Sequence, residues 1–317
     1  MLSRRHLRIK TLQALYAFFQ SGNDSIAAGE KSLHKHINRL YDLYIFQLDL
    51  LIELKYFVSQ RQEDAKKKFF PTEEDLHPNT RLADNLLIKQ LDDNEELLRR
   101  REKLNANWRD EVNLLLKIYN DLRSSEAYRE YLNDPAPGYK SDKEMLSYIV
   151  IEILSDYDLL RAIYEDRDIH WSDADFDISL LMVLKTINYF KKQMDKEEPL
   201  PDVFKDREED REYMVKLFRM TILRSEEFEK LVEEKATNWE LERIAIMDML
   251  ILKMALAEIL EFTNIPVKVS INEYIELSKI FSSQKSRVFI NGILDKLIQE
   301  LKSENKIVKT GRGLVNS

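Results

Sequence analysis

The chain has 317 residues, enough to bury a core of its own, and it contains no cysteine, which excludes disulfides, thiolate metal sites and cysteine nucleophiles. With only six glycines and seven prolines, few tight turns are available, so we predict an all-α fold dominated by long helices. No apolar run approaches the roughly 20 residues that cross a bilayer, and we expect a cytoplasmic protein.

The net charge of −8 is distributed unevenly along the chain. Residues 1–20 carry +4 and residues 264–317 carry another +4, whereas the 243 residues between them carry −16. Binding of RNA depends on local cationic surface that neutralises phosphates, not on the average charge of the chain. The acidic total therefore does not exclude an RNA-binding protein.

The first predicted helix covers residues near 3–20 and ends at Ser21-Gly22-Asn23-Asp24. A much longer helix is predicted over about 25–68, because apolar residues recur there at spacings of three and four. Further helical blocks are expected over about 79–134, over 141–193 and from 206 onward. Pairs of prolines separate these blocks.

These breaks predict three parts of the chain. They are N-terminal helices that run into a long helix at 1–70, an acidic helical segment at 71–202 and a C-terminal helical subdomain at 203–317.

The three tryptophans, Trp108, Trp171 and Trp239, recur at intervals of 63 and 68 residues. Sliding residues 146–189 onto 214–257 aligns Trp171 with Trp239 and matches most apolar positions in type. This indicates either an internal duplication of a helical hairpin or a chance match between amphipathic helices of similar length.

Residues 271–297, INEYIELSKIFSSQKSRVFINGILDKL, predict two amphipathic helices joined by a Ser-Ser turn. Ser270 and Glu273 have the spacing of a capping box, which predicts the start of the first helix after Pro266. Cationic, aromatic and amide residues crowd into 285–292 together with Gly292. A glycine inside a helix costs roughly 1 kcal/mol relative to alanine, and we expect Gly292 to serve close packing.

This C-terminal stretch resembles the signature of the NusB family of transcription antitermination proteins. The resemblance extends to residues 7–24, LRIKTLQALYAFFQSGND, and to residues 239–262, WELERIAIMDMLILKMALAEILEF. Tyr274 and Ser282 depart from the family pattern, because alanine and glycine are usual at these positions. The acidic segment at 71–202 would then be an insertion into a NusB-like helical bundle.

The resemblance implies a protein that binds single-stranded, boxA-like RNA together with a NusE-type small-subunit ribosomal protein. Such a complex ties the RNA to the elongating RNA polymerase and supports transcription of ribosomal RNA. The candidate RNA-binding residues are Arg4, Arg5, Arg8, Lys10, Tyr16, Lys285, Arg287, Phe289 and Asn291.

Each kind of candidate has a physical role and a structural alternative. Arginine and lysine would contact phosphates, although a short basic terminus is often only a solvated end. Tyr16 and Phe289 would stack on bases, although an aromatic residue on a helix usually belongs to the core. Asn291 could bind a base edge or make a capping or core hydrogen bond. If both segments bind one RNA, residues 4–10 must fold next to 285–292.

Two other functions are alternatives to this one. One is an interaction scaffold whose acidic helices bind a basic ribosomal or polymerase-associated protein, with weak or no RNA binding. The other is a ribosomal RNA cytosine methyltransferase, since NusB-like domains also occur fused to such enzymes. Those enzymes need catalytic cysteines and an α/β cofactor domain, and the chain has neither.

We therefore expect no catalytic residue, no metal and no cofactor. His34 and His36 point to different faces of one helix, which defeats a shared metal. Glu258 and Glu261 could contact a basic partner if exposed, but we expect them to lie on a plain solvated helix face.

Overall fold

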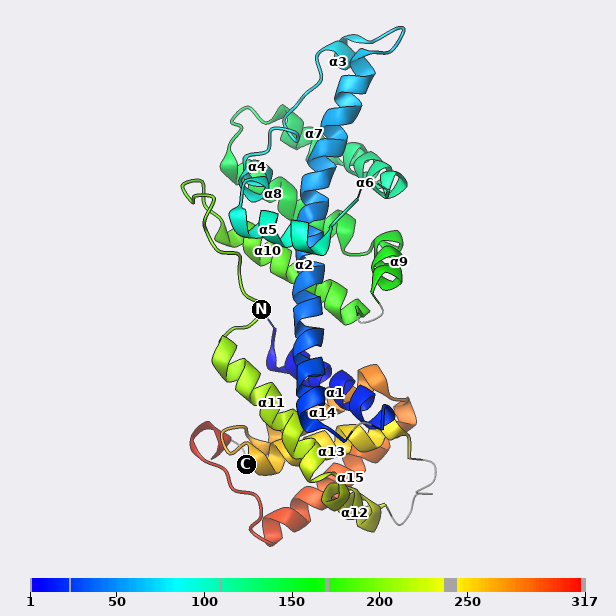
Figure 1. Ribbon diagram of the computed structural model, residues 1–317, viewed down its shortest axis with the longest axis vertical. Coiled ribbons are helices and arrows are strands. Elements are labelled where there is room, and N and C mark those ends of the chain that lie inside the picture. Colours follow the sequence, from blue (N-terminus) through cyan, green and yellow to red (C-terminus); the bar gives the residue numbers. More distant parts are fainter. Residues whose placement is uncertain (1, 23, 109, 169–170, 237–243, 315–317) are drawn as a thin grey trace. The chain divides into compact units, whose positions relative to one another are not determined.

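The computed structural model describes residues 2–22, 24–108, 110–168, 171–236 and 244–314, and every regular element within them is a helix (Figure 1). The predicted all-α fold is confirmed. The chain forms two compact units, which we call unit 1 (residues 38–203) and unit 2 (residues 2–37 and 204–317). Within the described part of the chain, no helix combines the length and apolarity needed to span a bilayer.

Unit 2 is assembled from both ends of the sequence. Its helices are α1 (Arg4–Gln20), the first part of α2 (Ile26–Lys66), α11 (Arg207–Leu223), α12 (Ser225–Lys235), α13 (Ile246–Glu261), α14 (Val267–Phe281) and α15 (Gln284–Ser303), followed by a short 3₁₀ turn (Gly311–Leu314).

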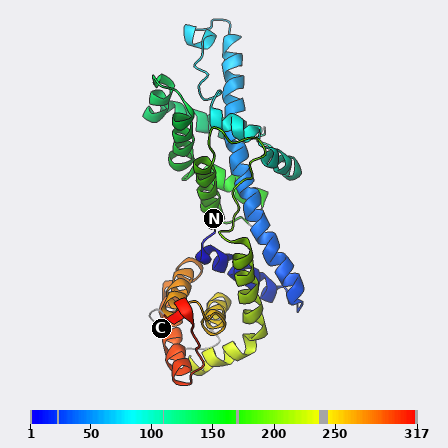
Figure 2. The same cartoon turned by 90° about the vertical axis from the view of Figure 1, so that its left-hand side faces the viewer.

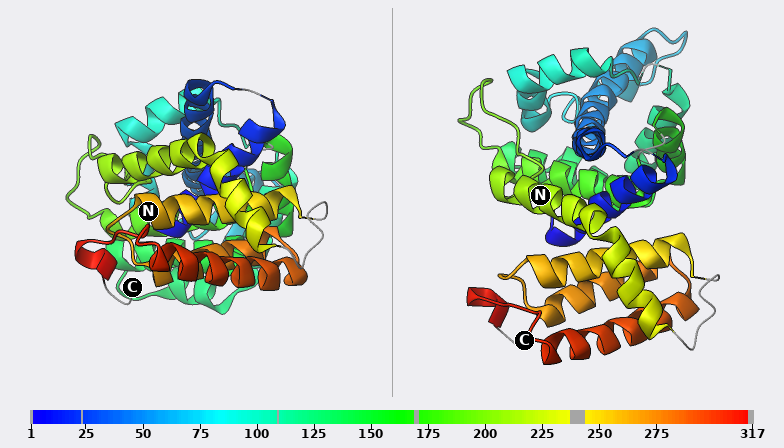
Figure 3. Two further views of the ribbon diagram at one scale, coloured as in Figure 1. Left: turned by 90° about the horizontal axis from the view of Figure 1, so that it is seen from below. Right: turned by 60° about the horizontal axis from the view of Figure 1, so that its bottom comes forward.

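Helix α13 forms the centre of unit 2. Nearly every side chain from Leu250 to Ile259 is buried, as expected for a helix that is apolar all round. It packs against α1, α11, α12, α14 and α15. Figure 3 shows α13, α14 and α15 running side by side. The predicted pair of C-terminal helices with a Ser-Ser turn is therefore present, and it covers one side of α13.

Unit 1 contains the rest of α2 and a set of shorter helices. These are α3 (Glu73–Leu76), α4 (Leu86–Asp92), α5 (Glu95–Leu104), α6 (Val112–Ser124), α7 (Glu126–Asn133), α8 (Tyr139–Tyr148) with its π-helical continuation (Ile149–Leu154), α9 (Asp158–Arg167) and α10 (Asp173–Tyr189).

Helix α2 forms the centre of unit 1, and Figure 2 shows it as one unbroken helix. Its side chains from Leu43 to Leu54 are mostly buried, on every face of the helix. Tyr44 shares a hydrogen bond of 2.7 Å with Thr186 of α10. The N-terminal part that we predicted at 1–70 is thus divided between the two units at residue 37.

The positions of the helices can be compared with the proposed internal repeat. Shifted by 68 residues, α8 with its π-helical continuation falls on 207–222, where α11 lies, and α9 falls on 226–235, where α12 lies. Shifted α10 covers 241–257, against 246–261 for α13. Trp239 lies outside the described residues. The hairpin duplication remains a prediction, now supported by two helices of matching position.

Gly29 and Gly292 are both helical glycines, but their surroundings differ. A Cβ added to Gly29 stands 2.6 Å from Cζ of Phe218 and 2.8 Å from Cδ2 of Phe18, whereas a Cβ added to Gly292 meets nothing within 4 Å. Gly29 thus permits close packing of two aromatic rings. The expectation that Gly292 serves close packing is wrong, because its side of α15 is open to solvent.

We predict opposite effects of alanine at these two positions. Gly29→Ala should lower the free energy of unfolding by about 1–2 kcal/mol, because overpacking outweighs the gain in helix propensity. Gly292→Ala should raise the same free energy by up to about 1 kcal/mol. Urea unfolding of both variants measures the difference. Equal stabilisation by both would contradict the packing around Gly29.

Candidate nucleic-acid interface

The basic N-terminal segment begins at a well-defined helix cap. Ser3 accepts a hydrogen bond from the backbone N–H of His6, and the Ser3 backbone N–H donates to Nδ1 of His6 at 3.1 Å. This reciprocal cap satisfies two amides that the first turn leaves unpaired. It thereby fixes the direction in which Arg4, Arg5 and Arg8 leave α1.

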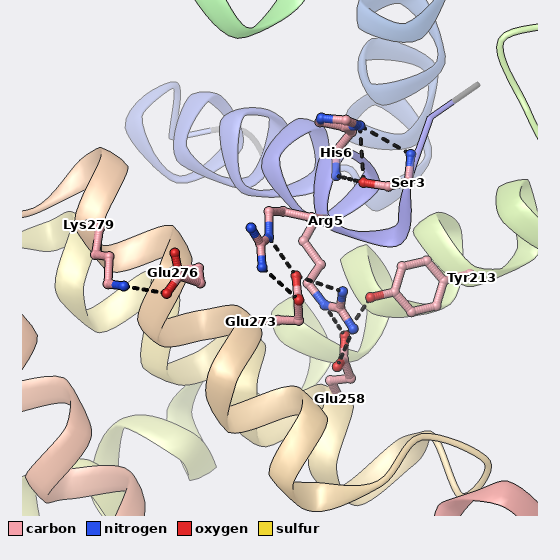
Figure 4. Close-up of polar contacts among 9 residues, drawn as sticks. Ser3, Arg5, His6, Tyr213, Glu258, Glu273, Glu276 and Lys279 are labelled. Atoms are coloured by element: carbon pink, nitrogen blue, oxygen red, sulfur yellow. Dashed lines mark hydrogen bonds and ion pairs between the residues drawn. The ribbon is translucent and has the colours of Figure 1, made fainter. Parts of the chain in front are cut away.

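Arg8 forms a buried ion pair in the core of unit 2 with Glu258, which is labelled in Figure 4. Arg8 is 2% exposed and Glu258 is 0% exposed. Two guanidinium nitrogens of Arg8 donate to the two carboxylate oxygens of Glu258, each at 2.7 Å. Such forked pairing is the strongest geometry available to an arginine and a carboxylate. The predicted solvated face at Glu258 is therefore wrong.

Three hydroxyl groups complete the shell of Glu258. Ser270 donates at 2.7 Å, Tyr213 at 2.5 Å and Tyr274 at 3.2 Å. Burial alone would raise the pKa of Glu258, but the charge and hydrogen bonds of Arg8, together with the hydroxyls of Tyr213 and Ser270, hold the pKa below its ordinary value. Tyr274, which departs from the family pattern, is thus a buried partner of this carboxylate.

The predicted capping box at Ser270 and Glu273 does not form. Helix α14 begins earlier, at Val267, with Pro266 in an extended conformation at the cap. A proline lacks the N–H that a helix start leaves unpaired, so it is well suited to this place. Ser270 is consequently buried inside the helix and binds Glu258, while Glu273 accepts two hydrogen bonds from Arg5, both of 2.9 Å.

Arg4 and Arg5 are half-buried at the start of α1. The Arg4 guanidinium lies 2.6 Å from Glu209 and 4.3 Å from the ring centroid of Tyr213. Both arginines can reach solvent, but each already has an acidic partner. Lys10 is buried, and Tyr16 is exposed on the same helix. Of the N-terminal candidates, Arg4, Arg5 and Tyr16 therefore remain accessible, whereas Arg8 and Lys10 belong to the interior.

The C-terminal candidates lie in the first turns of α15, which Ser283 caps by accepting a hydrogen bond from Ser286. Lys285 and Asn291 are exposed and Arg287 is half-buried. Phe289 is only 5% exposed, so it cannot stack on a base in this conformation. The physical reason is helical periodicity, which places Phe289 on the same face as the core residues Ile293 and Leu297.

Helix α14 connects the two basic segments electrostatically. Glu276 on α14 has a pKa below its ordinary value, first because Lys279 hydrogen bonds to it, and also because of the charges of Arg5 and Arg287. Arg5 comes from α1 and Arg287 from α15, so the charges of basic residues from opposite ends of the sequence act on one half-buried carboxylate. Sequence patterns alone did not predict Glu258, Glu273 and Glu276 as partners of the arginines.

A groove of about 1140 Å³ opens beside the start of α1. It has both acidic and basic walls, so it is not a purely cationic channel. Its charged lining residues are Arg4, Arg5, His6, Arg8, Glu209, Glu212, Lys216, Glu261 and Glu273.

The C-terminal segment packs along this groove. Lys309 donates to the carbonyl of Phe262 at 2.9 Å, and the Thr310 N–H donates to the carbonyl of Thr263 at 2.9 Å. Burial lowers the pKa of Lys309 to about 8. The segment is thereby fastened to the connection between α13 and α14.

Comparison with known proteins agrees with this fold. The model of the NusB family matches residues 180–299, which include Glu258, Glu273 and the 285–291 cluster. A transcription antitermination protein NusB from Alkaliphilus oremlandii is 43% identical over 93 residues, which are 29% of this chain and 67% of that protein. The chain belongs to the NusB family.

Two further relatives carry the same name, transcription antitermination protein NusB. The one from Salinibacter ruber is 41% identical over 105 residues, which are 33% of this chain and 66% of that protein. The one from Chloroherpeton thalassium is 41% identical over 106 residues, which are 33% of this chain and 50% of that protein. The chain thus spans between half and two thirds of the length of these two NusB proteins. No solved structure matches the chain.

The family match begins inside α10 and ends inside α15. It leaves out α1 with its basic residues and nearly all of unit 1. The family match therefore says nothing about the roles of α1 and unit 1, which must be inferred from their own residues.

Proposed function

We propose that this NusB-family protein is a transcription antitermination factor without enzymatic activity. It binds boxA-like single-stranded RNA together with a NusE-type small-subunit ribosomal protein, and it supports ribosomal RNA transcription by the elongating polymerase. The observation that carries the proposal is that basic residues from both ends of the chain come together at α14. Arg5 of α1 hydrogen bonds to Glu273 of α14, and α14 packs against α15, which carries Lys285 and Arg287. Proteins bind RNA largely through its phosphates. A surface to which two basic segments contribute cationic side chains can neutralise those phosphates.

The distribution of charge supports the same proposal. Unit 2 contains 25 Lys or Arg and 22 Asp or Glu, a net charge of +3 within a chain of −8. The accessible residues proposed to contact RNA are Arg4, Arg5, Tyr16, Lys285, Arg287 and Asn291. Arg8, Lys10 and Phe289 would act indirectly, because their burial holds α1 and α15 in place.

Replacing Lys285 and Arg287 together by alanine should weaken binding of a boxA RNA oligonucleotide. The slope of log affinity against log salt should become shallower by about 0.7 for each phosphate contact that is lost on a single strand. Binding is measured with and without the NusE-type partner, across a salt series.

Lys140→Ala is the matched control, since this exposed lysine lies on α8 of unit 1. It should leave the slope unchanged. The proposal would be contradicted if the affinity of the wild-type protein for RNA depended neither on the RNA sequence nor on the partner. Phe289→Ala is unsuitable as a test, because loss of a buried ring would change stability as well as binding.

A second candidate function is supported by unit 1. Its sequence contains 24 Lys or Arg against 35 Asp or Glu, a net charge of −11. An acidic helical unit of this kind favours a basic protein as its partner. If the protein binds a basic ribosomal or polymerase-associated protein but binds RNA weakly or not at all, the scaffold function is preferred.

A further inference from the structure

Two phenylalanines project from unit 1 where α2 ends. Phe69 is 90% exposed and Phe70 is 83% exposed, the highest values among the large apolar side chains that the structure describes. Their rings meet edge to face, with centroids 4.7 Å apart. Figure 1 shows the connection between α2 and α3 that carries them. Single exposed apolar residues are common, but a paired aromatic cluster in full solvent indicates an interaction site.

The connection that presents these rings is held by several hydrogen bonds. Lys68 donates to Asp75 at 2.8 Å, and Asp75 and Thr72 cap α3 reciprocally. Further along, Gln62 on α2 donates to the carbonyl of Asn79 at 2.9 Å. Pro71 directly after the pair restricts the backbone further. The backbone that carries the rings is thus held in place, which reduces the backbone entropy that is lost when a partner binds.

The charges around the pair decide which class of partner fits. Lys66, Lys67 and Lys68 precede the rings, but each forms an ion pair within the same connection or the last turns of α2. Residues 60–76 contain four basic and five acidic side chains, and unit 1 as a whole carries −11. A polyanion such as RNA or an anionic lipid surface finds no excess of positive charge here. A basic protein does find complementary charge.

We propose that Phe69 and Phe70 form the anchor by which unit 1 binds a basic protein, with both rings inserted into an apolar pocket of that partner. This inference rests on the second candidate function, and it names the surface that performs it. Large aromatic side chains that become fully buried dominate the energetics of such interfaces. The acidic residues of unit 1 would surround the anchor and steer the basic partner toward it.

The test uses the full-length chain with the photoreactive amino acid p-benzoylphenylalanine in place of Phe70. Irradiation in extract of the source cells should crosslink it to one protein rich in lysine and arginine, which is then identified and purified. The dissociation constant of that protein is measured for the wild type, for the double variant Phe69→Ala, Phe70→Ala and for Leu181→Ala. Leu181 is an exposed apolar control in the same unit.

We expect the dissociation constant to rise at least about tenfold in the double variant and to stay unchanged in Leu181→Ala. Urea unfolding should be the same for all three proteins, because the two rings contribute little to the core. Crosslinks to RNA, to lipid or to a second copy of this chain would overturn the proposal, as would no crosslink or an unchanged dissociation constant.

Binding of boxA RNA by the double variant separates this inference from the proposed RNA function. The double variant should bind the oligonucleotide as the wild type does. A loss of RNA affinity would assign the rings to base stacking and overturn the protein anchor. If the wild type binds no RNA at all, the proposed RNA function is wrong. The dissociation constant of the crosslinked protein still tests the proposed anchor.

Discussion

Arg8→Ala is expected to lower the free energy of unfolding by about 3–5 kcal/mol, because it leaves the fully buried carboxylate of Glu258 without its cation. Three hydroxyl donors remain, but they carry no charge to offset desolvation. Arg5→Ala is the matched control. Its partner Glu273 is only half-buried, so the loss there should stay below about 1 kcal/mol. Urea unfolding at pH 7 compares the two variants.

The pH dependence gives a second measurement of the same pair. In the wild type, the pKa of Glu258 lies below its ordinary value of 4.5, so its contribution to stability is present above pH 4.5 and is lost as the pH falls through the lower, folded pKa. In Arg8→Ala, burial without the cation should raise the pKa of Glu258 above 4.5.

The sign of the effect is then reversed in the variant. Its folded state takes up a proton more readily than its unfolded state, so the stability difference from wild type should shrink as the pH is lowered from 7 toward 5. A difference that stays constant over this range would contradict the assignment of the loss to an uncompensated carboxylate.

The first two helices could be predicted well, because each is specified by local signals. The predicted helix at 3–20 is found at Arg4–Gln20, and the long helix predicted at 25–68 is found at Ile26–Lys66. Apolar spacing and the flanking turn residues suffice for such elements. The start of α14 was missed because two signals compete there, and the proline at 266 prevails over the Ser270 capping pattern.

The partners of the arginines could not be predicted from spacing alone. Pairs such as Arg8 and Glu258 join residues 250 positions apart, and sequence periodicity does not show which helices meet. One signal was available for Glu258. It stands in the run MLILKMALAEIL, which is apolar on all faces, and a carboxylate inside such a helix must be buried and paired.

The exposure of the candidate RNA-binding residues also depends on which helix faces pack together, which the sequence alone does not show. Phe289 lies within a few residues of Lys285, Arg287 and Asn291 in the sequence. It nevertheless shares a helix face with Ile293 and packs into the core. Phe69 and Phe70 show the opposite case. Composition predicts aromatic residues to be buried, but a connection that turns between α2 and α3 gives them no neighbouring core to enter.

In unit 1, Trp108→Ala is expected to lower the free energy of unfolding by about 3–5 kcal/mol. Trp108 is fully buried. Its ring meets Phe46 and Tyr164 edge to face, with centroids 6.3 and 5.7 Å away, and the Arg167 guanidinium lies 4.6 Å from its centroid. Removal of the indole leaves a cavity at the centre of these contacts, and aromatic pairs of this geometry contribute beyond their buried area.

Trp108→Phe is expected to cost less than half as much, for two reasons. A phenyl ring keeps part of the edge-to-face packing, so the residual cavity is smaller. The indole N–H also has no hydrogen-bond partner among the described residues, so its removal sacrifices no hydrogen bond and relieves the burial of an unpaired donor. Urea unfolding of both variants measures the difference. Equal losses would contradict the role given to the edge-to-face packing that a phenyl ring retains.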